Sequence, residues 1–149
     1  MERIVQGAPA ELWQALVRDG SARGGCCLDE ASESYLVFVL LRHQRDGHLL
    51  ARTQALEWLH AQGQTGSLRA DALRDVGDRC LLIAGLYPAL AERRRVALDY
   101  FVELGRGAYR EVAEASRNAY ADLFAQLAAR YRELVQALRA LRDAAVVRP

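Results

Sequence analysis

The chain has 149 residues, of which 52% are hydrophobic and 26% are charged, and its formal net charge is +1. A chain of this length fits one domain, 1–149, that can bury a sufficient core without disulfides or a metal ion. The near-neutral charge argues against nucleic acid or an anionic membrane surface as a partner.

Two further features of the composition bear on where the protein works. All 20 basic residues are arginine, which favours a GC-rich bacterial gene. The longest apolar run, 35–41, is far shorter than the roughly 20 residues that span a bilayer, and the first residues do not resemble a secretory signal. We therefore expect a bacterial protein of the cytoplasm.

Apolar residues recur with helical spacing along nearly the whole chain, and sustained strand alternation is absent. Pro9 suits the first turn of a helix that we expect to end before Gly20, with 20–25 as a connection. A second helix is predicted over 29–45, where acidic residues precede an apolar middle and basic residues follow it. Because 35–41 is apolar on every side, this helix is predicted to lie at the centre of the bundle.

Three more helices are predicted in the middle of the chain. The third covers 48–62, with an inward row of Leu49, Thr53, Leu56 and His60. The fourth follows Ser67, which is placed to cap it, and its last two turns, 80–86, are apolar all round and therefore buried. After a short turn from Pro88, the fifth covers 94–114, and its predicted inward residues are Ala97, Tyr100, Phe101, Leu104, Ala108 and Val112.

The last predicted helix, 117–145, is long and amphipathic. Its apolar residues are spaced alternately four and three apart: Tyr120, Phe124, Leu127, Tyr131, Leu134, Leu138, Leu141 and Ala145. This 3.5-residue repeat is typical of helices that pack with knobs in holes. A helix of that length would extend about 40 Å, so we expect it to continue past the bundle and pair with a second copy in a homodimer.

Four glycines lie inside predicted helices: Gly77 and Gly85 in the fourth, and Gly105 and Gly107 in the fifth. Each costs a helix about 1 kcal/mol relative to alanine, so each needs a compensating contact. Close approach of two helices is one explanation, and a ligand pressed against the backbone is the other.

Asp78 follows Gly77 at the border of the apolar turns of the fourth helix. A carboxylate in this position must be exposed, paired with an arginine, or part of a polar site. Arg74 and Arg79 are the local candidates for pairing.

The segment 77–88, together with Tyr100 and the Gly-Arg-Gly-Ala-Tyr run at 105–109, resembles a pattern in uncharacterised bacterial all-helical proteins. In that pattern an apolar helix opens with Gly-Asp and ends in Gly-aromatic-Pro, and a helix with Tyr, Gly and Ala-Tyr follows. Tyr87 stands where the pattern has phenylalanine. The resemblance covers about 35–113 and implies a helical fold, with no known activity.

Histidine and cysteine residues give no recognisable metal or redox motif. His43 and His60 fall at different ends of neighbouring helices, so a shared metal site is not expected. His60 is predicted to be a partly buried ring with a hydrogen-bond partner, with a haem ligand as the open alternative. Cys26 and Cys27 precede a helix, where they are either small buried residues or a reactive pair, and Cys80 is predicted to lie in the core.

The fold predicted from the sequence is all-α, a single helical bundle of about six helices with a long C-terminal amphipathic helix. The leading hypothesis for function is a non-enzymatic interaction or regulatory module that pairs with itself or with another protein, without a catalytic residue, cofactor or metal. The alternative is a bundle, an enzyme included, that binds a small molecule or cofactor between the fourth and fifth helices. The residues expected to line that pocket are Asp78, Gly85, Tyr87, Tyr100, Gly105 and Tyr109.

Overall fold

The computed structural model describes residues 9–25, 28–43, 53–93 and 95–147. All regular secondary structure in this part of the chain is helical, and it contains no strand. Its eight helices are α2 (Pro9–Arg23), α3 (Glu30–His43), α4 (Gln54–Gln62), α5 (Gly66–Gly85), α6 (Pro88–Arg93), α7 (Leu98–Ala115), α8 (Asn118–Ala129) and α9 (Tyr131–Val147). The predicted all-α class is confirmed. The number of helices exceeds the predicted six because the turn at Pro88 is itself helical and the last helix is divided in two.

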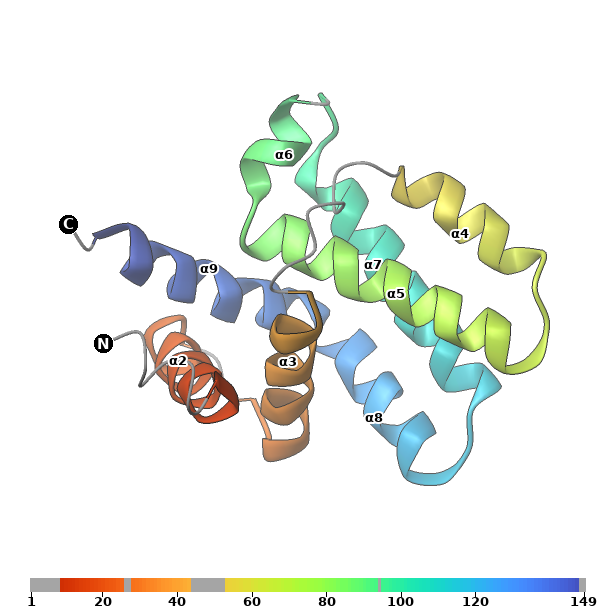
Figure 1. Ribbon diagram of the computed structural model, residues 1–149, viewed down its shortest axis with the longest axis horizontal. Coiled ribbons are helices and arrows are strands. Elements are labelled where there is room, and N and C mark those ends of the chain that lie inside the picture. The colour runs from red at the N-terminus through yellow and green to blue at the C-terminus, as the bar shows by residue number, and fades with distance from the viewer. Residues whose placement is uncertain (1–8, 26–27, 44–52, 94, 148–149) are drawn as a thin grey trace.

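Helix α5 is the centre of the structure and contacts α4, α6, α7 and α9. Figure 1 shows α5 and α7 side by side, with α8 folding back along α7 and α9 leading away beneath α5. Helix α2 packs against α3 and α9 at the other end of the molecule. Because α3 runs across the direction of α9 and α2 is seen nearly end on, the helices do not form one antiparallel bundle.

The most buried segment is the second half of α5, as its apolar sequence predicts. All residues of 80–85 are buried, and Leu73 and Val76 extend this core toward the start of the helix. Helix α3 is also largely buried, but its Phe38 is 45% exposed, so the run 35–41 is not enclosed on every side.

Two predicted helix ends are wrong. Helix α2 continues through Gly20 to Arg23. Glycine is required at this position because a Cβ would lie 2.8 Å from the carbonyl oxygen of Ala137, so α2 and α9 can approach closely. Thr65, and not Ser67, is the N-cap of α5, and its side chain makes no capping hydrogen bond.

The predicted inward row of the third helix faces solvent. Leu56 is 62% exposed and His60 is also exposed, and Leu49 lies outside the described residues. The opposite side of α4 is held by polar contacts instead: the indole of Trp58 donates to Glu111 Oε2 (3.2 Å), and the Gln62 amide donates to Glu111 Oε1 (2.9 Å). Arg69 of α5 pairs with the same carboxylate at 2.6 Å. This network orients α4, which the apolar pattern alone misplaced.

The long final helix is broken at Arg130, whose backbone (φ −107°, ψ 21°) departs from helical geometry. No proline or glycine marks the break. Phe124 and Leu127 before it, and Leu134 and Leu138 after it, are all fully buried within the chain. Since the core of the protomer itself occupies this apolar seam, the seam no longer supports the homodimer prediction.

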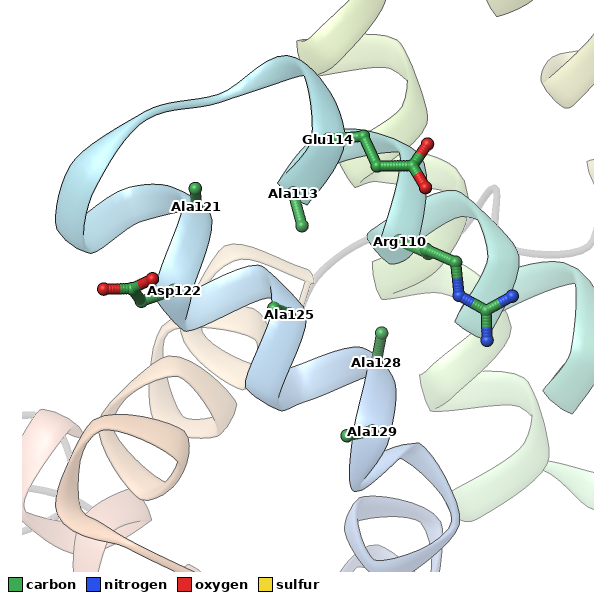
Figure 2. Close-up of a pocket in the computed structure, with 8 residues that line it drawn as sticks. All are labelled: Arg110, Ala113, Glu114, Ala121, Asp122, Ala125, Ala128 and Ala129. Atoms are coloured by element: carbon green, nitrogen blue, oxygen red, sulfur yellow. The ribbon is translucent and has the colours of Figure 1, made fainter.

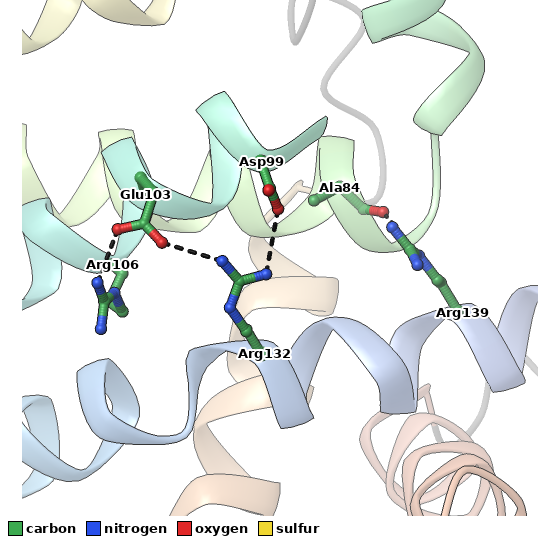
Figure 3. A network of polar contacts seen from close by, with 6 residues as sticks. All are labelled: Ala84, Asp99, Glu103, Arg106, Arg132 and Arg139. Carbon is green, nitrogen blue, oxygen red and sulfur yellow. Dashed lines mark hydrogen bonds and ion pairs between the residues drawn. The ribbon is translucent and has the colours of Figure 1, made fainter. Parts of the chain in front are cut away.

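An exposed ion-pair network ties α7 to α9 (Figure 3). Arg132 pairs with Asp99 (3.2 Å) and Glu103 (3.0 Å), and Arg106 pairs with Glu103 (2.7 Å). Such pairs in water contribute little each, so they align the two helices more than they stabilise them. None of the described helices has the length and hydropathy needed to cross a bilayer.

Candidate functional site

The most unusual side chain in the structure is Asp78, a fully buried carboxylate in the middle of α5. Two helices that flank α5 supply its hydrogen-bond donors. The hydroxyl of Tyr35 on α3 donates to Asp78 Oδ1 at 2.7 Å, and the hydroxyl of Tyr109 on α7 donates to the same oxygen at 2.6 Å. Such short O–H to carboxylate bonds are strong and offset part of the cost of burying the charge.

The second carboxylate oxygen faces a histidine. His43 Nε2, at the end of α3, lies 3.8 Å from Asp78 Oδ2, and both side chains are almost entirely excluded from solvent. Oδ2 accepts no hydrogen bond from the described residues. Two phenols and an imidazole contact this carboxylate, and the charge of the predicted partner Arg74 also acts on it.

The tyrosines around Asp78 are held in their protonated, donating form. Burial, followed by the nearby Asp78 charge, raises the pKa of Tyr35 and of Tyr109 above that of an exposed tyrosine. Burial also raises the pKa of Tyr131, whose hydroxyl donates to the carbonyl oxygen of Gly77 at 2.8 Å. The cluster is therefore a fixed set of phenol donors, two directed at Asp78 and one at the Gly77 carbonyl.

Three of the four helix glycines are explained by close packing, as one of the two sequence interpretations proposed. A Cβ on Gly77 would collide with the ring of Tyr109, and a Cβ on Gly105 would collide with the hydroxyl of Tyr131. A Cβ on Gly85 would lie 2.5 Å from Leu138 Cβ. Tyrosine and leucine side chains thus occupy the space that the alternative interpretation assigned to a ligand. Gly107 meets nothing within 4 Å, so packing does not explain it.

Of the six residues expected to line a pocket between the fourth and fifth helices, the structure brings Asp78, Gly105 and Tyr109 into the buried cluster. Gly85 faces α9 instead. Tyr87 and Tyr100 are each 45% exposed and lie outside the cluster.

Sequence reasoning missed Tyr35, Tyr131 and His43 as members of the cluster. The rings of Tyr35, Tyr109 and Phe124 form a chain of edge contacts with centroids 5.2–6.0 Å apart, and Tyr131 extends it at 5.4 Å from Tyr109. The available signal was that inward-facing tyrosines on three helices each need a buried hydrogen-bond acceptor. Among the described residues, no group of three potential ligands could hold a metal ion.

A second feature is a groove of about 430 Å³ between α7 and α8. Figure 2 shows that alanines from both helices line it, with charged side chains at its edges. Arg110 and Glu114 lie one turn apart on the α7 edge, and Asp122 lies on the α8 edge. These three side chains are exposed and make no ion pair with a described residue.

No family model, curated protein or solved structure matches the chain. The resemblance to uncharacterised bacterial all-helical proteins therefore stays a prediction, and the functional argument depends on the geometry of this molecule.

Proposed function

We propose that this protein is a non-enzymatic interaction module that pairs with a second copy of itself through the groove between α7 and α8. The observation that carries the proposal is the alanine lining of this groove, combined with edge charges of both signs that pair with no described residue. Small side chains let two helices pack closely, because the interaxial distance depends on the side chains at the contact.

The charges favour a second copy over another partner. In a twofold dimer each patch meets its own image. If the axis lies perpendicular to α7, the two α7 helices run antiparallel, and Arg110 of one protomer faces the partner's Glu114. The reciprocal pair forms at the same time. Two residues of opposite charge one turn apart on one helix are self-complementary in this arrangement.

The proposed surface replaces the one expected from the sequence. Leu134, which the apolar repeat placed at a dimer seam, is fully buried in the protomer. A charge at that position would unfold the chain whatever its oligomeric state. We further propose, from the arginine-only composition and the buried free thiol of Cys80, that the module works in the bacterial cytoplasm.

Sedimentation velocity over a concentration series up to about 100 µM tests the pairing. We expect the wild type to form a dimer and the Ala125→Trp variant, which fills the groove, to remain a monomer. Ala119→Trp is the matched control, because Ala119 is an exposed alanine of the same helix that does not line the groove. It should dimerise as the wild type does. A wild type that stays monomeric throughout the series would refute the proposal.

A further inference from the structure

The α7–α8 groove carries one charge that the pairing of Arg110 with Glu114 does not use. Asp122 lies on the α8 edge of the groove, where its side chain is exposed (Figure 2). It makes no ion pair with a described residue. No basic residue stands one turn away on α8, since positions 118, 119, 125 and 126 are Asn, Ala, Ala and Gln. The helix that carries this carboxylate therefore provides no nearby partner for its charge.

The short connection between α7 and α8 sets the height of Asp122 along the groove. Helix α7 ends at Ala115, α8 begins at Asn118, and α8 folds back along α7. Position 112, midway between Arg110 and Glu114, is three residues before the end of α7. Position 121 is likewise three residues after the start of α8, so Asp122 lies about 1.5 Å in helix rise from the level of position 112.

The twofold axis of the proposed dimer passes at this level. The axis is perpendicular to α7 and midway between Arg110 and Glu114, because each of these residues faces the other across it. The rotation that places α7 against its own copy also places α8 against its own copy. Asp122 then faces the partner's Asp122, with an offset of only about 3 Å along the helices. Since the axes of packed helices lie about 8–10 Å apart, the two carboxylates meet across the interface.

We infer that Asp122 limits the strength of self-pairing, because the two like charges repel each other across the twofold axis. This role of Asp122 rests on the proposed pairing through α7. Coulomb repulsion at about 8 Å, with an effective dielectric constant of about 20–80, weakens association by roughly 2- to 30-fold. The dimer is therefore held in a range where the two copies separate readily. Salt screens this repulsion as it screens the Arg110–Glu114 pairs, so the two effects of salt oppose each other.

Neutralising the charge measures the repulsion. In sedimentation velocity of the full chain at about 20 mM salt, Asp122→Asn should dimerise roughly 2- to 30-fold more tightly than the wild type. At about 1 M salt, where the screening length falls to about 3 Å, the two proteins should dimerise alike. Asp71→Asn is the matched control, because Asp71 is an exposed aspartate of α5 outside the groove. It should follow the wild type at both salt concentrations.

Reversing the charge shows which residue Asp122 faces. Asp122→Arg places two guanidinium groups at the axis, so this variant should dimerise no more tightly than the wild type. A variant that dimerises more tightly would show that Asp122 faces a different acidic residue. In a mixture of wild-type and Asp122→Arg chains, opposite charges meet at the axis. Native mass spectrometry should therefore show more mixed dimer than random exchange produces.

The outcomes separate this role from the pairing itself. A wild type that stays monomeric up to about 100 µM at both salt concentrations would refute the pairing, and the role of Asp122 with it. A wild type that dimerises while Asp122→Asn is no tighter, or a random proportion of mixed dimers, would overturn the role of Asp122 and leave the pairing intact.

Discussion

Replacing Gly105 with alanine is the most discriminating test of the core, because Gly107 on the same helix provides a matched control. Both glycines lie inside α7, so alanine at either position gains about 1 kcal/mol of helix propensity. Their surroundings differ. A Cβ at position 107 meets nothing within 4 Å, whereas one at position 105 would collide with the Tyr131 hydroxyl and lie 2.8 Å from Cys80 Cβ.

The expected magnitudes follow from these contacts. Gly107→Ala should stabilise the fold by about 1 kcal/mol. In Gly105→Ala, overpacking costs about 1–3 kcal/mol. Displacing the Tyr131 hydroxyl from the Gly77 carbonyl leaves buried polar groups unpaired, which costs about 1–3 kcal/mol more. After the propensity gain is subtracted, Gly105→Ala should lose about 1–5 kcal/mol.

Thermal unfolding followed by circular dichroism measures the difference. At about 2–4 °C per kcal/mol for a chain of this size, the two variants should differ in Tm by on the order of 10 °C, with the wild type between them. Equal Tm values for the two variants would refute the close approach of α5, α7 and Tyr131.

Three further predictions concern charge and titration. Because the pKa of Tyr35 is raised, its contribution to stability is complete below about pH 9 and is lost as the pH rises past about 10. The free energy of unfolding therefore declines at alkaline pH. Tyr35→Phe should reduce this decline by about 1.4 kcal/mol per pH unit, as urea titrations would show. The same variant leaves one fewer donor on a buried carboxylate and should cost about 1.5–3 kcal/mol at about pH 7 in those titrations, and an unchanged stability would contradict the observed hydrogen bond. Glu111→Ala should cost about 1–3 kcal/mol of unfolding free energy, since it removes the acceptor of three half-buried donors. Arg132→Ala should cost less than about 1 kcal/mol, because its ion pairs are exposed. The reverse order of the two costs in urea unfolding would contradict the assignment.

Helical periodicity located the helices well where the buried face is apolar. The run 80–86 at the end of α5 is apolar on every side, and the burial of 80–85 followed directly from the sequence. Periodicity failed where polar contacts decide the orientation. Helix α4 turns Trp58 toward Glu111, 53 residues away, and leaves Leu56 in solvent. No local pattern records such a contact.

The candidate site shows the same limit. Asp78 stood out in the sequence because a carboxylate beside apolar turns needs a partner. That partner could not be read from neighbouring residues, since Tyr35 is 43 positions before it and Tyr109 is 31 positions after it. The break at Arg130 was likewise invisible, because no proline or glycine marks it.

A charge-swap experiment tests the central claim, self-pairing through α7, most directly. Arg110→Glu would place two carboxylates opposite each other across the interface, because the new side chain would face the partner's Glu114. Glu114→Arg would bring two guanidinium groups together in the same way. Sedimentation velocity should show that each single variant dissociates at least tenfold more readily than the wild type, about 1.4 kcal/mol. The double variant, with the charges exchanged, should dimerise again. Single variants that associate like the wild type, or a double variant no tighter than the singles, would contradict the account.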